Sequence, residues 1–170
     1  MSDKILIDGY IILTPDELNQ EILYLLEHKI KEKYILCNHE YGYITKLCKI
    51  HNGYTSYIER NSGNVKISVR FLAERILPTI GKQLVCTVHM IFNHGIFAQI
   101  GENIKILIPA ISIKNGKYSV DDGDDCSKHP VFKISGDDGI KIIESDDTLK
   151  ITINEVKYNK NRYNCIGQLS

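Results

Sequence analysis

The 170-residue sequence predicts an α+β protein, in which a small antiparallel sheet with one helix is followed by a five-stranded β-barrel. The first 80 residues hold one capped, amphipathic helix between segments with the pattern of strands. From Lys82 onward the helical spacing of apolar residues disappears, and five short strand-like segments follow within about 90 residues. With 43% apolar and 25% charged residues, the chain has the composition of a globular protein and not of a fibrous or disordered one.

The N-terminal segment predicts a strand and then a helix. Residues Lys4–Leu13 are rich in Ile and Leu, which is typical of a buried strand. Thr14, Pro15 and Glu17 supply an N-cap hydroxyl, a proline at the first helical position and an acid three residues after the cap, which form a capping box. We expect the helix to run from Pro15 to about Lys33. Its apolar stripe consists of Leu18, Ile22, Leu25, Leu26 and Ile30.

An antiparallel meander is expected to complete the first domain. Ile44–Ile50 and Tyr54–Glu59 have the composition of strands, and a turn signal follows at residues 61–64. After the turn, four apolar residues alternate with three polar ones, the pattern of a half-buried strand. The alternating residues are Val65, Lys66, Ile67, Ser68, Val69, Arg70 and Phe71. Pro78 and Gly81 mark the end of this domain, which we place at residues 1–80.

The second half of the chain predicts a closed barrel. Its strand-like segments are Gln83–Phe92, Gly95–Gly101, Asn103–Ile113, Thr148–Lys157 and Arg162–Leu169. Five short strands are typical of a small closed barrel, of which the OB-fold is the common five-stranded case. We place this OB-fold domain at residues 81–170. An acidic insert at about 114–147 separates the third and fourth strands, and its segments 131–134 and 140–144 predict an extra hairpin around the turn at 136–139.

The charge of the chain balances overall but is unevenly distributed. There are 21 basic and 21 acidic residues in total. Residues 81–117 and 148–170 each hold 4 basic residues and 1 acidic residue, a net charge of +3, whereas residues 118–147 hold 3 and 9, a net charge of −6. Strands built from the two basic segments can attract a polyanion. The alternative is that these charges belong to ordinary solvated strand faces.

Neither a membrane nor an oxidising compartment is indicated. The longest apolar runs, such as Ile106–Ile108, are far shorter than the roughly 20 residues that a bilayer crossing needs. Residues 1–9 lack the pattern of a secretory signal. The five cysteines show neither zinc spacing nor a disulfide framework, so we expect an intracellular, reducing compartment.

The sequence predicts no catalytic residue, no metal and no cofactor. It contains no nucleophile elbow, phosphate-binding loop, zinc spacing or dinucleotide fingerprint. Asp121–Asp125 are rich in carboxylates but lack the ligand spacing of an EF-hand, so we interpret this segment as a solvated acidic loop. The six histidines share no common spacing. An enzyme is the least favoured class.

Residues around the first turn of the barrel are candidates for RNA binding. Phe92, His94 and Phe97 lie where OB-folds place aromatic rings for unstacked bases, and stacking contributes about 1–3 kcal/mol per base. Polar side chains of neighbouring strands and loops would hold the phosphates. These are Lys105, Lys157, Lys160, Arg162 and Tyr163. The alternative is that Phe92 and Phe97 point into the core, because alternation alone does not give the register.

Several short segments occur in the order found in one known family. They are Tyr41-Gly42-Tyr43-Ile44, Val69-Arg70-Phe71, Pro78, Gly81-Lys82-Gln83-Leu84-Val85, His94-Gly95-Ile96-Phe97-Ala98-Gln99-Ile100-Gly101 and Ile166-Gly167-Gln168-Leu169. Together with the order of the domains, they resemble the stalk subunit of RNA polymerase, the family that comprises the seventh subunit of eukaryotic RNA polymerase II and its archaeal counterpart. The resemblance covers nearly the whole chain.

The resemblance implies a noncatalytic subunit of a DNA-directed RNA polymerase. Its N-terminal domain would dock on the polymerase core by a tip, and its OB barrel would meet RNA leaving the enzyme. The tip would be formed by two loops, which consist of Tyr41, Gly42 and Tyr43 and of Arg60, Asn61, Ser62, Gly63 and Asn64. Members of the family pair with a small helical fourth-subunit partner. Pro78 and Gly81 would form a short, stiff hinge between the domains.

Two features depart from the family pattern, and one bears on the origin of the chain. Cys86 replaces the glycine that the family usually carries near the start of the first barrel strand, and the acidic insert is an addition. Isoleucine is frequent, and Lys outnumbers Arg 17 to 4, which favours an A+T-rich genome. This bias resembles that of a large cytoplasmic DNA virus. It would place the protein in the cytoplasm or nucleus of a host cell, or in a virion.

Two other hypotheses remain open. A freestanding OB-fold RNA-binding protein, such as a translation factor, would use the same surface of Phe92, His94 and Phe97. A purely architectural module would instead contact protein through the exposed face of the barrel. The balanced charge of the chain predicts only weak RNA binding, which favours a subunit that its complex holds near RNA at a high effective concentration.

Overall fold

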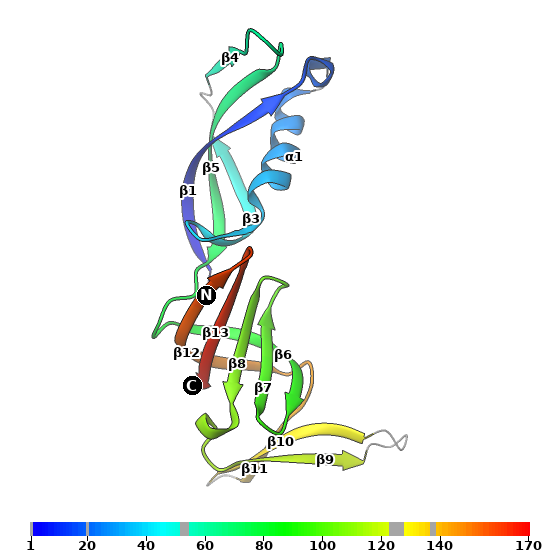
Figure 1. Ribbon diagram of the computed structural model, residues 1–170, viewed down its shortest axis with the longest axis vertical. Coiled ribbons are helices and arrows are strands. Elements are labelled where there is room, and N and C mark those ends of the chain that lie inside the picture. Colours follow the sequence, from blue (N-terminus) through cyan, green and yellow to red (C-terminus); the bar gives the residue numbers. More distant parts are fainter. Residues whose placement is uncertain (1, 20, 52–54, 123–127, 137–138) are drawn as a thin grey trace. The chain divides into compact units, whose positions relative to one another are not determined.

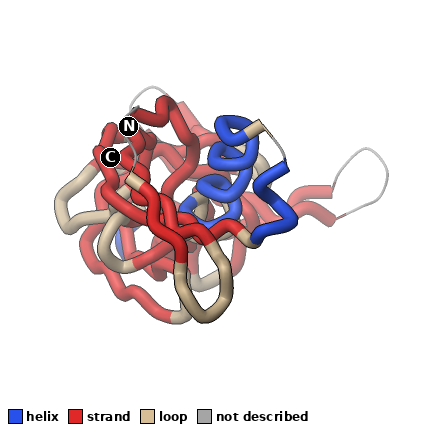
Figure 2. The backbone as a smooth tube through the Cα atoms, turned by 90° about the horizontal axis from the view of Figure 1, so that it is seen from above, coloured by secondary structure: helices blue, strands red, loops and turns tan. Residues whose placement is uncertain are grey.

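The computed structural model describes residues 2–19, 21–51, 55–122, 128–136 and 139–170 (Figure 1). The described chain is mostly β-structure with one α-helix, as the predominance of strands in Figure 2 shows. It divides into two compact units, Ser2–Leu77 and Pro78–Ser170. Each unit is described by itself.

The N-terminal unit is an antiparallel sheet with strand β5 (Val65–Ile76) at its centre. Strand β1 (Asp3–Leu13) pairs with one edge of β5. Strands β3 (Gly42–His51) and β4 (Ser56–Ile58) share the other edge. Strand β2 (Cys37–Asn38) pairs with the start of β3. The β4–β5 hairpin is therefore confirmed, but the simple meander is wrong because β3 pairs with β5 and not with β4.

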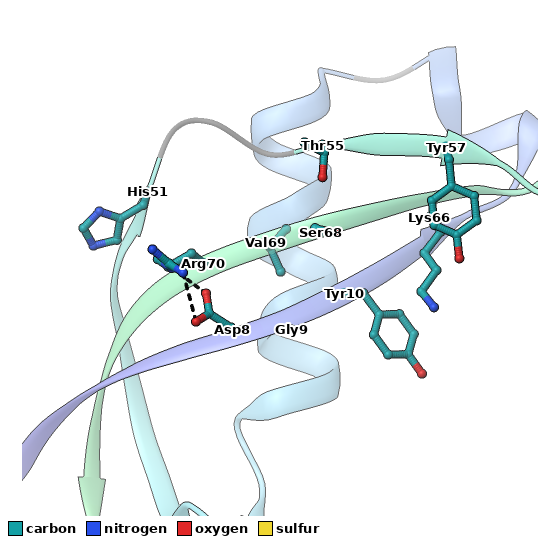
Figure 3. Close-up of a pocket in the computed structure, with 10 residues that line it drawn as sticks. All are labelled: Asp8, Gly9, Tyr10, His51, Thr55, Tyr57, Lys66, Ser68, Val69 and Arg70. Atoms are coloured by element: carbon teal, nitrogen blue, oxygen red, sulfur yellow. Dashed lines mark hydrogen bonds and ion pairs between the residues drawn. The ribbon is translucent and has the colours of Figure 1, made fainter.

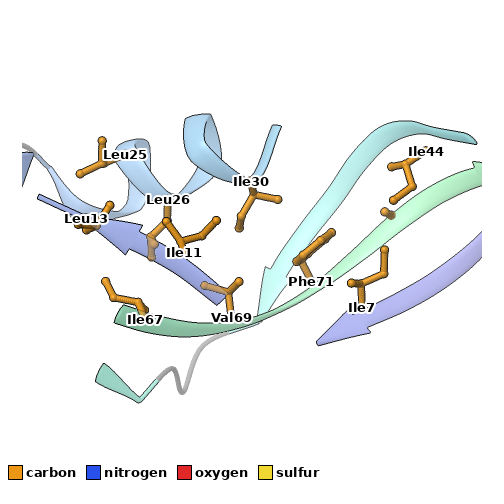
Figure 4. Packing of buried hydrophobic residues seen from close by; sticks show 11 residues of the cluster. Ile7, Ile11, Leu13, Leu25, Leu26, Ile30, Ile44, Ile67, Val69 and Phe71 are labelled. Atoms are coloured by element: carbon orange, nitrogen blue, oxygen red, sulfur yellow. The ribbon is translucent and has the colours of Figure 1, made fainter. Parts of the chain in front are cut away.

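The predicted alternation along β5 is confirmed, and it gives the sheet two different faces. The apolar members of the pattern lie on one face, and the polar members lie on the other. The apolar face packs against helix α1 (Ile22–Tyr34), as Figure 4 shows. The ring of Tyr34 meets that of Phe71 edge to face, with 5.0 Å between centroids. The buried cluster consists of Ile7, Ile11, Leu13, Leu25, Leu26, Ile30, Ile44, Ile67, Val69, Phe71 and Ala73.

The helix begins later than the capping box predicts. The main-chain N–H of Thr14 does donate to a Glu17 carboxylate oxygen over 3.0 Å. However, the turn at Pro15–Asn19 is a 3-10 helix, and α1 begins only at Ile22. Leu18, expected in the apolar stripe, is 45% exposed, and the buried side of the helix begins at Leu25. Packing on the sheet decides at which residue the α-helix begins, because short helices depend on tertiary contacts.

The predicted five-stranded barrel is confirmed. Its strands are β6 (Gln83–Phe92), β7 (Gly95–Ile100), β8 (Ile104–Pro109), β12 (Thr148–Asn159) and β13 (Arg162–Leu169). They close in the order β12-β13-β8-β7-β6. Neighbouring strands are antiparallel, except that β13 runs parallel to β8. Strand β8 ends earlier than predicted, because a short 3-10 helix forms at Ala110–Ser112.

Alternate residues of the barrel strands fill its interior. Cys86 is one of these buried residues. Its thiol donates to the carbonyl oxygen of Leu149 over 3.6 Å. Burial raises the pKa of the Cys86 and Cys165 thiols to about 11, so both stay protonated at neutral pH. Cys86 therefore belongs to the core of the barrel.

The insert forms a sheet of its own, in the order β11-β10-β9. The expected hairpin consists of β10 (Lys128–Gly136) and β11 (Gly139–Ile143). Strand β9 (Gly116–Asp122) was not predicted, because it offers only Tyr118 and Val120 as an apolar pattern. Residues 123–125 of the predicted acidic loop and residues 137–138 of the predicted turn lie outside the described residues, as does Tyr54.

The expected hinge is held at one end by the barrel. The N–H of Gly81 donates to the carbonyl oxygen of Ile153 over 2.7 Å. The N–H of Ile153 donates in turn to the carbonyl oxygen of Lys82 over 3.0 Å. These bonds attach residues 81 and 82 to β12. Gly81 is therefore a part of the barrel unit and not of a free linker.

Replacing Phe71 by alanine tests the N-terminal core. We expect Phe71→Ala to lower the free energy of unfolding by about 3–5 kcal/mol, because the lost ring leaves a cavity between the sheet and α1. Urea denaturation followed by circular dichroism measures the change. Leu72→Ala, at the neighbouring half-buried position of β5, is the matched control and should cost clearly less. Equal losses for the two variants would contradict this assignment of the faces.

Candidate nucleic-acid interface

Two rows of outward-facing side chains cross neighbouring strands of the barrel. The polar row consists of Lys157, Asn164, Lys105 and Gln99. The apolar row beside it consists of Ile166, Leu107, Phe97 and Met90, with Glu155 at its β12 end. Partners on neighbouring strands share a face of the sheet, so each row is a continuous surface. The barrel thus presents a strip of cations and amides next to a strip of apolar groups.

Phe97 is the aromatic centre of this surface. The Lys105 ammonium lies 6.0 Å from the centroid of its ring, and the His89 ring lies 6.4 Å away, centroid to centroid. A hollow of about 270 Å³ adjoins Phe97 and is also lined by Lys105, Leu107 and Lys157. A ring with ammonium groups beside it is the combination that binds a base and its phosphate.

The structure brings together three of the eight predicted RNA-binding residues. Phe97, Lys105 and Lys157 line the same hollow. Arg162 is exposed on β13, two residues before Asn164 and therefore on the same side of the strand. Phe92 also faces outward and is 46% exposed. The alternative that both phenylalanines fill the core is therefore wrong.

Tyr163 and His94 do not belong to this surface. Tyr163 is 3% exposed, and its ring packs against that of Tyr158 with 5.0 Å between centroids. The prediction that it contacts RNA is wrong, because it takes an inward position in the alternation of β13. His94 lies in the β6–β7 turn beside Ala110, and Lys160 lies beyond the other end of β8. The turn that carries His94 and the turn that carries Lys160 are therefore separated by the length of β7, about 17 Å at the rise of a strand.

The turn that carries Lys160 has an uncommon backbone. Lys160 and Asn161 have φ angles of 47° and 60°, which is the conformation of a two-residue type I′ hairpin turn. The Tyr158 hydroxyl donates to Asn161 Oδ1 over 3.1 Å and holds the turn. Asparagine accepts this conformation, but for lysine it costs about 1–2 kcal/mol. The turn therefore presents a strained, exposed lysine next to Arg162.

A β-bulge explains why sequence alternation missed part of the surface. The register of β6 against β7 shifts between Val88 and Met90. His89 and Met90 are therefore both exposed, and Phe92 turns outward. Leu107 and Ile166 were missed for another reason. Apolar residues in a strand predict the core unless the register is known.

The predicted docking residues lie at opposite ends of β5. Gly42 and Tyr43 are not a loop but the start of β3, beside Ile76, and only Tyr41 belongs to the preceding turn. Residues 60–64 precede Val65 at the other end of β5. At the rise of a strand, β5 spans roughly 35 Å. The two segments therefore do not form one tip.

The glycine of the Tyr41-Gly42-Tyr43 motif has a structural role. Gly42 has a φ angle of 83°, and a Cβ atom there would lie 2.8 Å from the carbonyl oxygen of Ile76. Only glycine satisfies both conditions. The turn at 60–64, by contrast, is exposed apart from half-buried Asn64. Within it the Gly63 N–H donates to the Glu59 carbonyl oxygen over 2.9 Å, so a defined turn ends this side of the unit.

Comparison of the chain with protein-family models gave no match, and comparison with curated proteins gave none either. Among the described residues, no group of three or more His, Cys, Asp or Glu side chains is placed to hold a metal ion. No helix in the described part of the chain has the length and apolarity needed to span a bilayer.

The Lys160 turn provides a test in which stability and binding change in opposite directions. We expect Lys160→Gly to raise the free energy of unfolding by about 1 kcal/mol, because glycine adopts the positive φ angle without strain. The same change removes a cation. The slope of log affinity against log salt for single-stranded RNA should therefore fall by the amount that corresponds to about one phosphate contact. Asn115→Gly, at another positive-φ position, is the control and should leave RNA binding unchanged. Unaltered RNA binding by Lys160→Gly would contradict a role for this turn.

Proposed function

We propose that this chain is a noncatalytic, stalk-like subunit of a DNA-directed RNA polymerase. Its N-terminal unit docks on the polymerase core, and its barrel contacts RNA that leaves the enzyme during transcription. The observation that carries the proposal is the outward surface of the polar and apolar rows, with Phe97 between Lys105 and His89.

The order of the barrel strands supports an OB-fold. The first three strands, β6, β7 and β8, follow one another as antiparallel neighbours. The fifth strand, β13, lies parallel beside the third, and the fourth, β12, closes the barrel against the first. OB-folds bind oligonucleotides on the face of their second and third strands. Phe97 and Lys105 belong to these two strands.

The balance of charges favours a subunit over a freestanding RNA-binding protein. The hollow beside Phe97 has two cationic side chains, Lys105 and Lys157, and one carboxylate, Glu155. A net charge of this size predicts weak binding at physiological salt. A complex that holds the barrel near the transcript compensates through effective concentration. The alternative is a freestanding single-stranded RNA-binding protein such as a translation factor. Such a protein would have to bind RNA tightly through this surface alone, because no complex would hold it near the RNA.

Docking is assigned to one end of the N-terminal unit. The turn at Arg60–Asn64 is the candidate contact with RNA polymerase core subunits, because it ends the unit at the opposite end of β5 from Leu77. The Tyr41–Tyr43 segment is not included, since Gly42 serves the backbone at the other end. A small helical partner like the family's fourth subunit, and a place in the cytoplasm, the nucleus or a virion of a large DNA virus, are parts of the same proposal.

Purification of the tagged chain from its native source tests the proposal. We expect it to retain the large subunits of an RNA polymerase and to crosslink to nascent RNA under ultraviolet light. Phe97→Ala should keep the polymerase but lose most of the crosslinking, because a stacking contact is worth about 1–3 kcal/mol. Arg60→Glu should do the reverse and lower polymerase retention.

The outcomes of this purification separate the hypotheses. A chain that retains no transcription proteins but binds RNA alone would contradict the proposal and favour the freestanding protein. Retention of polymerase with crosslinking unchanged in Phe97→Ala would favour an architectural module. Tyr163→Phe, a change inside the barrel core, is the control that should alter neither readout.

A further inference from the structure

The face of the N-terminal sheet opposite α1 is hollowed. A cavity of about 770 Å³ lies over β1, β4 and β5, and Figure 3 shows the side chains that line it. We call it the sheet basin. Lys66, Ser68 and Arg70 line it from β5, Asp8 and Tyr10 from β1, and Thr55 and Tyr57 from β4 and the residue before it. These β5 residues are the polar members of the alternation described above.

The basin contains one carboxylate among its described lining residues, and that group is already paired. Arg70 donates to both carboxylate oxygens of Asp8, with the Nη2 bond at 3.1 Å. The two residues face each other across β1 and β5. The hydrogen bond from Arg70 lowers the pKa of Asp8, so its carboxylate stays ionised and bound to the guanidinium. Asp8 is therefore not the counter-ion of Lys66, the lysine among the described lining residues.

Two lysine ammonium groups lie against one tyrosine ring. Lys66 Nζ is 4.0 Å from the centroid of Tyr10 and 5.8 Å from that of Tyr57. Lys33 is not a lining residue of the basin, but from the end of α1 it places its Nζ 3.6 Å from the Tyr10 centroid and donates to the Tyr10 carbonyl oxygen over 2.7 Å. Among the described residues, neither lysine has a carboxylate partner. Two like charges on one ring repel each other, and a bound anion would relieve that repulsion.

We propose that the sheet basin binds single-stranded RNA, with a phosphate held at the Tyr10 ring by the ammonium groups of Lys66 and Lys33 and a base on Tyr57. Tyr57 is 55% exposed and stands directly opposite Lys66 on β4, so a ring and a cation are adjacent. An acidic peptide would use the two ammonium groups but would give the exposed rings no role. Stacking rings beside cations are what single-stranded nucleic acids require. The inference goes beyond the proposed function, which assigns RNA to the barrel alone.

Binding of a labelled oligouridine 12-mer to the full-length chain, followed by fluorescence anisotropy over a range of salt, tests the inference. We expect the double variant Lys33→Gln/Lys66→Gln to weaken binding about 10- to 30-fold at 0.1 M salt and to lower the log–log salt slope by about 1.4, which corresponds to two phosphate contacts of a single strand. Lys46→Gln/Lys49→Gln on β3 is the matched control, since it removes the same charge from two exposed lysines that neither line the basin nor lie against the Tyr10 ring. It should change the affinity less than twofold.

Two further variants keep the test independent of folding. Tyr57→Ala is expected to weaken binding about 5- to 150-fold through lost stacking, while Tyr57→Phe keeps the ring and should bind like the wild type. Urea midpoints show whether each variant is folded. Equal effects of the two lysine pairs, or full binding by a folded Tyr57→Ala, would overturn the inference. Displacement of the RNA by a poly-glutamate peptide of equal charge in the wild type, but not in Lys33→Gln/Lys66→Gln, would overturn it in favour of an acidic peptide.

The same assay separates this inference from the proposed function. If Phe97→Ala leaves RNA binding intact and Lys33→Gln/Lys66→Gln weakens it, the basin is the RNA site and the assignment to the barrel fails. If only Phe97→Ala weakens binding, the barrel is the RNA site and the basin is not.

Discussion

The parallel pairing of β13 with β8 is the constraint on which the barrel surface depends. It joins Tyr163–Ile166 to Ile104–Leu107, strands separated in sequence by the whole insert, and so closes the barrel. Because alternate residues of a closed strand face inward, this register puts Tyr163 into the core and Asn164 beside Lys105 on the outside. A slip of one residue would exchange the two faces and remove both rows. The candidate interface is therefore a consequence of how the barrel closes.

The two units repeat one chemical arrangement on different scaffolds. In the barrel, Lys105 stands next to the ring of Phe97, and in the N-terminal sheet Lys66 stands next to that of Tyr10. Both arrangements lie on outward faces of antiparallel strands, where side chains of neighbouring strands meet. The acidic surplus is concentrated in residues 118–147 of the insert. This acidic surplus offsets the basic segments of the barrel, while residues 1–80 are balanced by themselves, with 10 basic and 10 acidic residues.

Much of the fold was predictable from local sequence, because turns and alternation are local signals. The bounds of β6 and β13 agree with the prediction, whereas at Thr14 one bond of the predicted capping box forms and the α-helix begins later. The bulge at Val88–Met90 depends instead on pairing with β7, and no local pattern shows it. For the site, Phe97 and Lys105 were found from residue type and position. Partners such as Asn164 and Ile166 lie on β13, which is a neighbour of β8 in the barrel but is far from it in sequence, and the register between such strands is a tertiary property.

In the function that we propose, one end of this chain docks on a polymerase while the Phe97 surface contacts RNA. Electron cryomicroscopy of the transcribing complex that the tagged chain retains would test both parts at once. We expect the Arg60–Asn64 turn to touch a core subunit and RNA density to lie against Phe97 and Lys105. A complex in which another protein covers that surface, or in which the 60–64 turn is free in solvent, would contradict it.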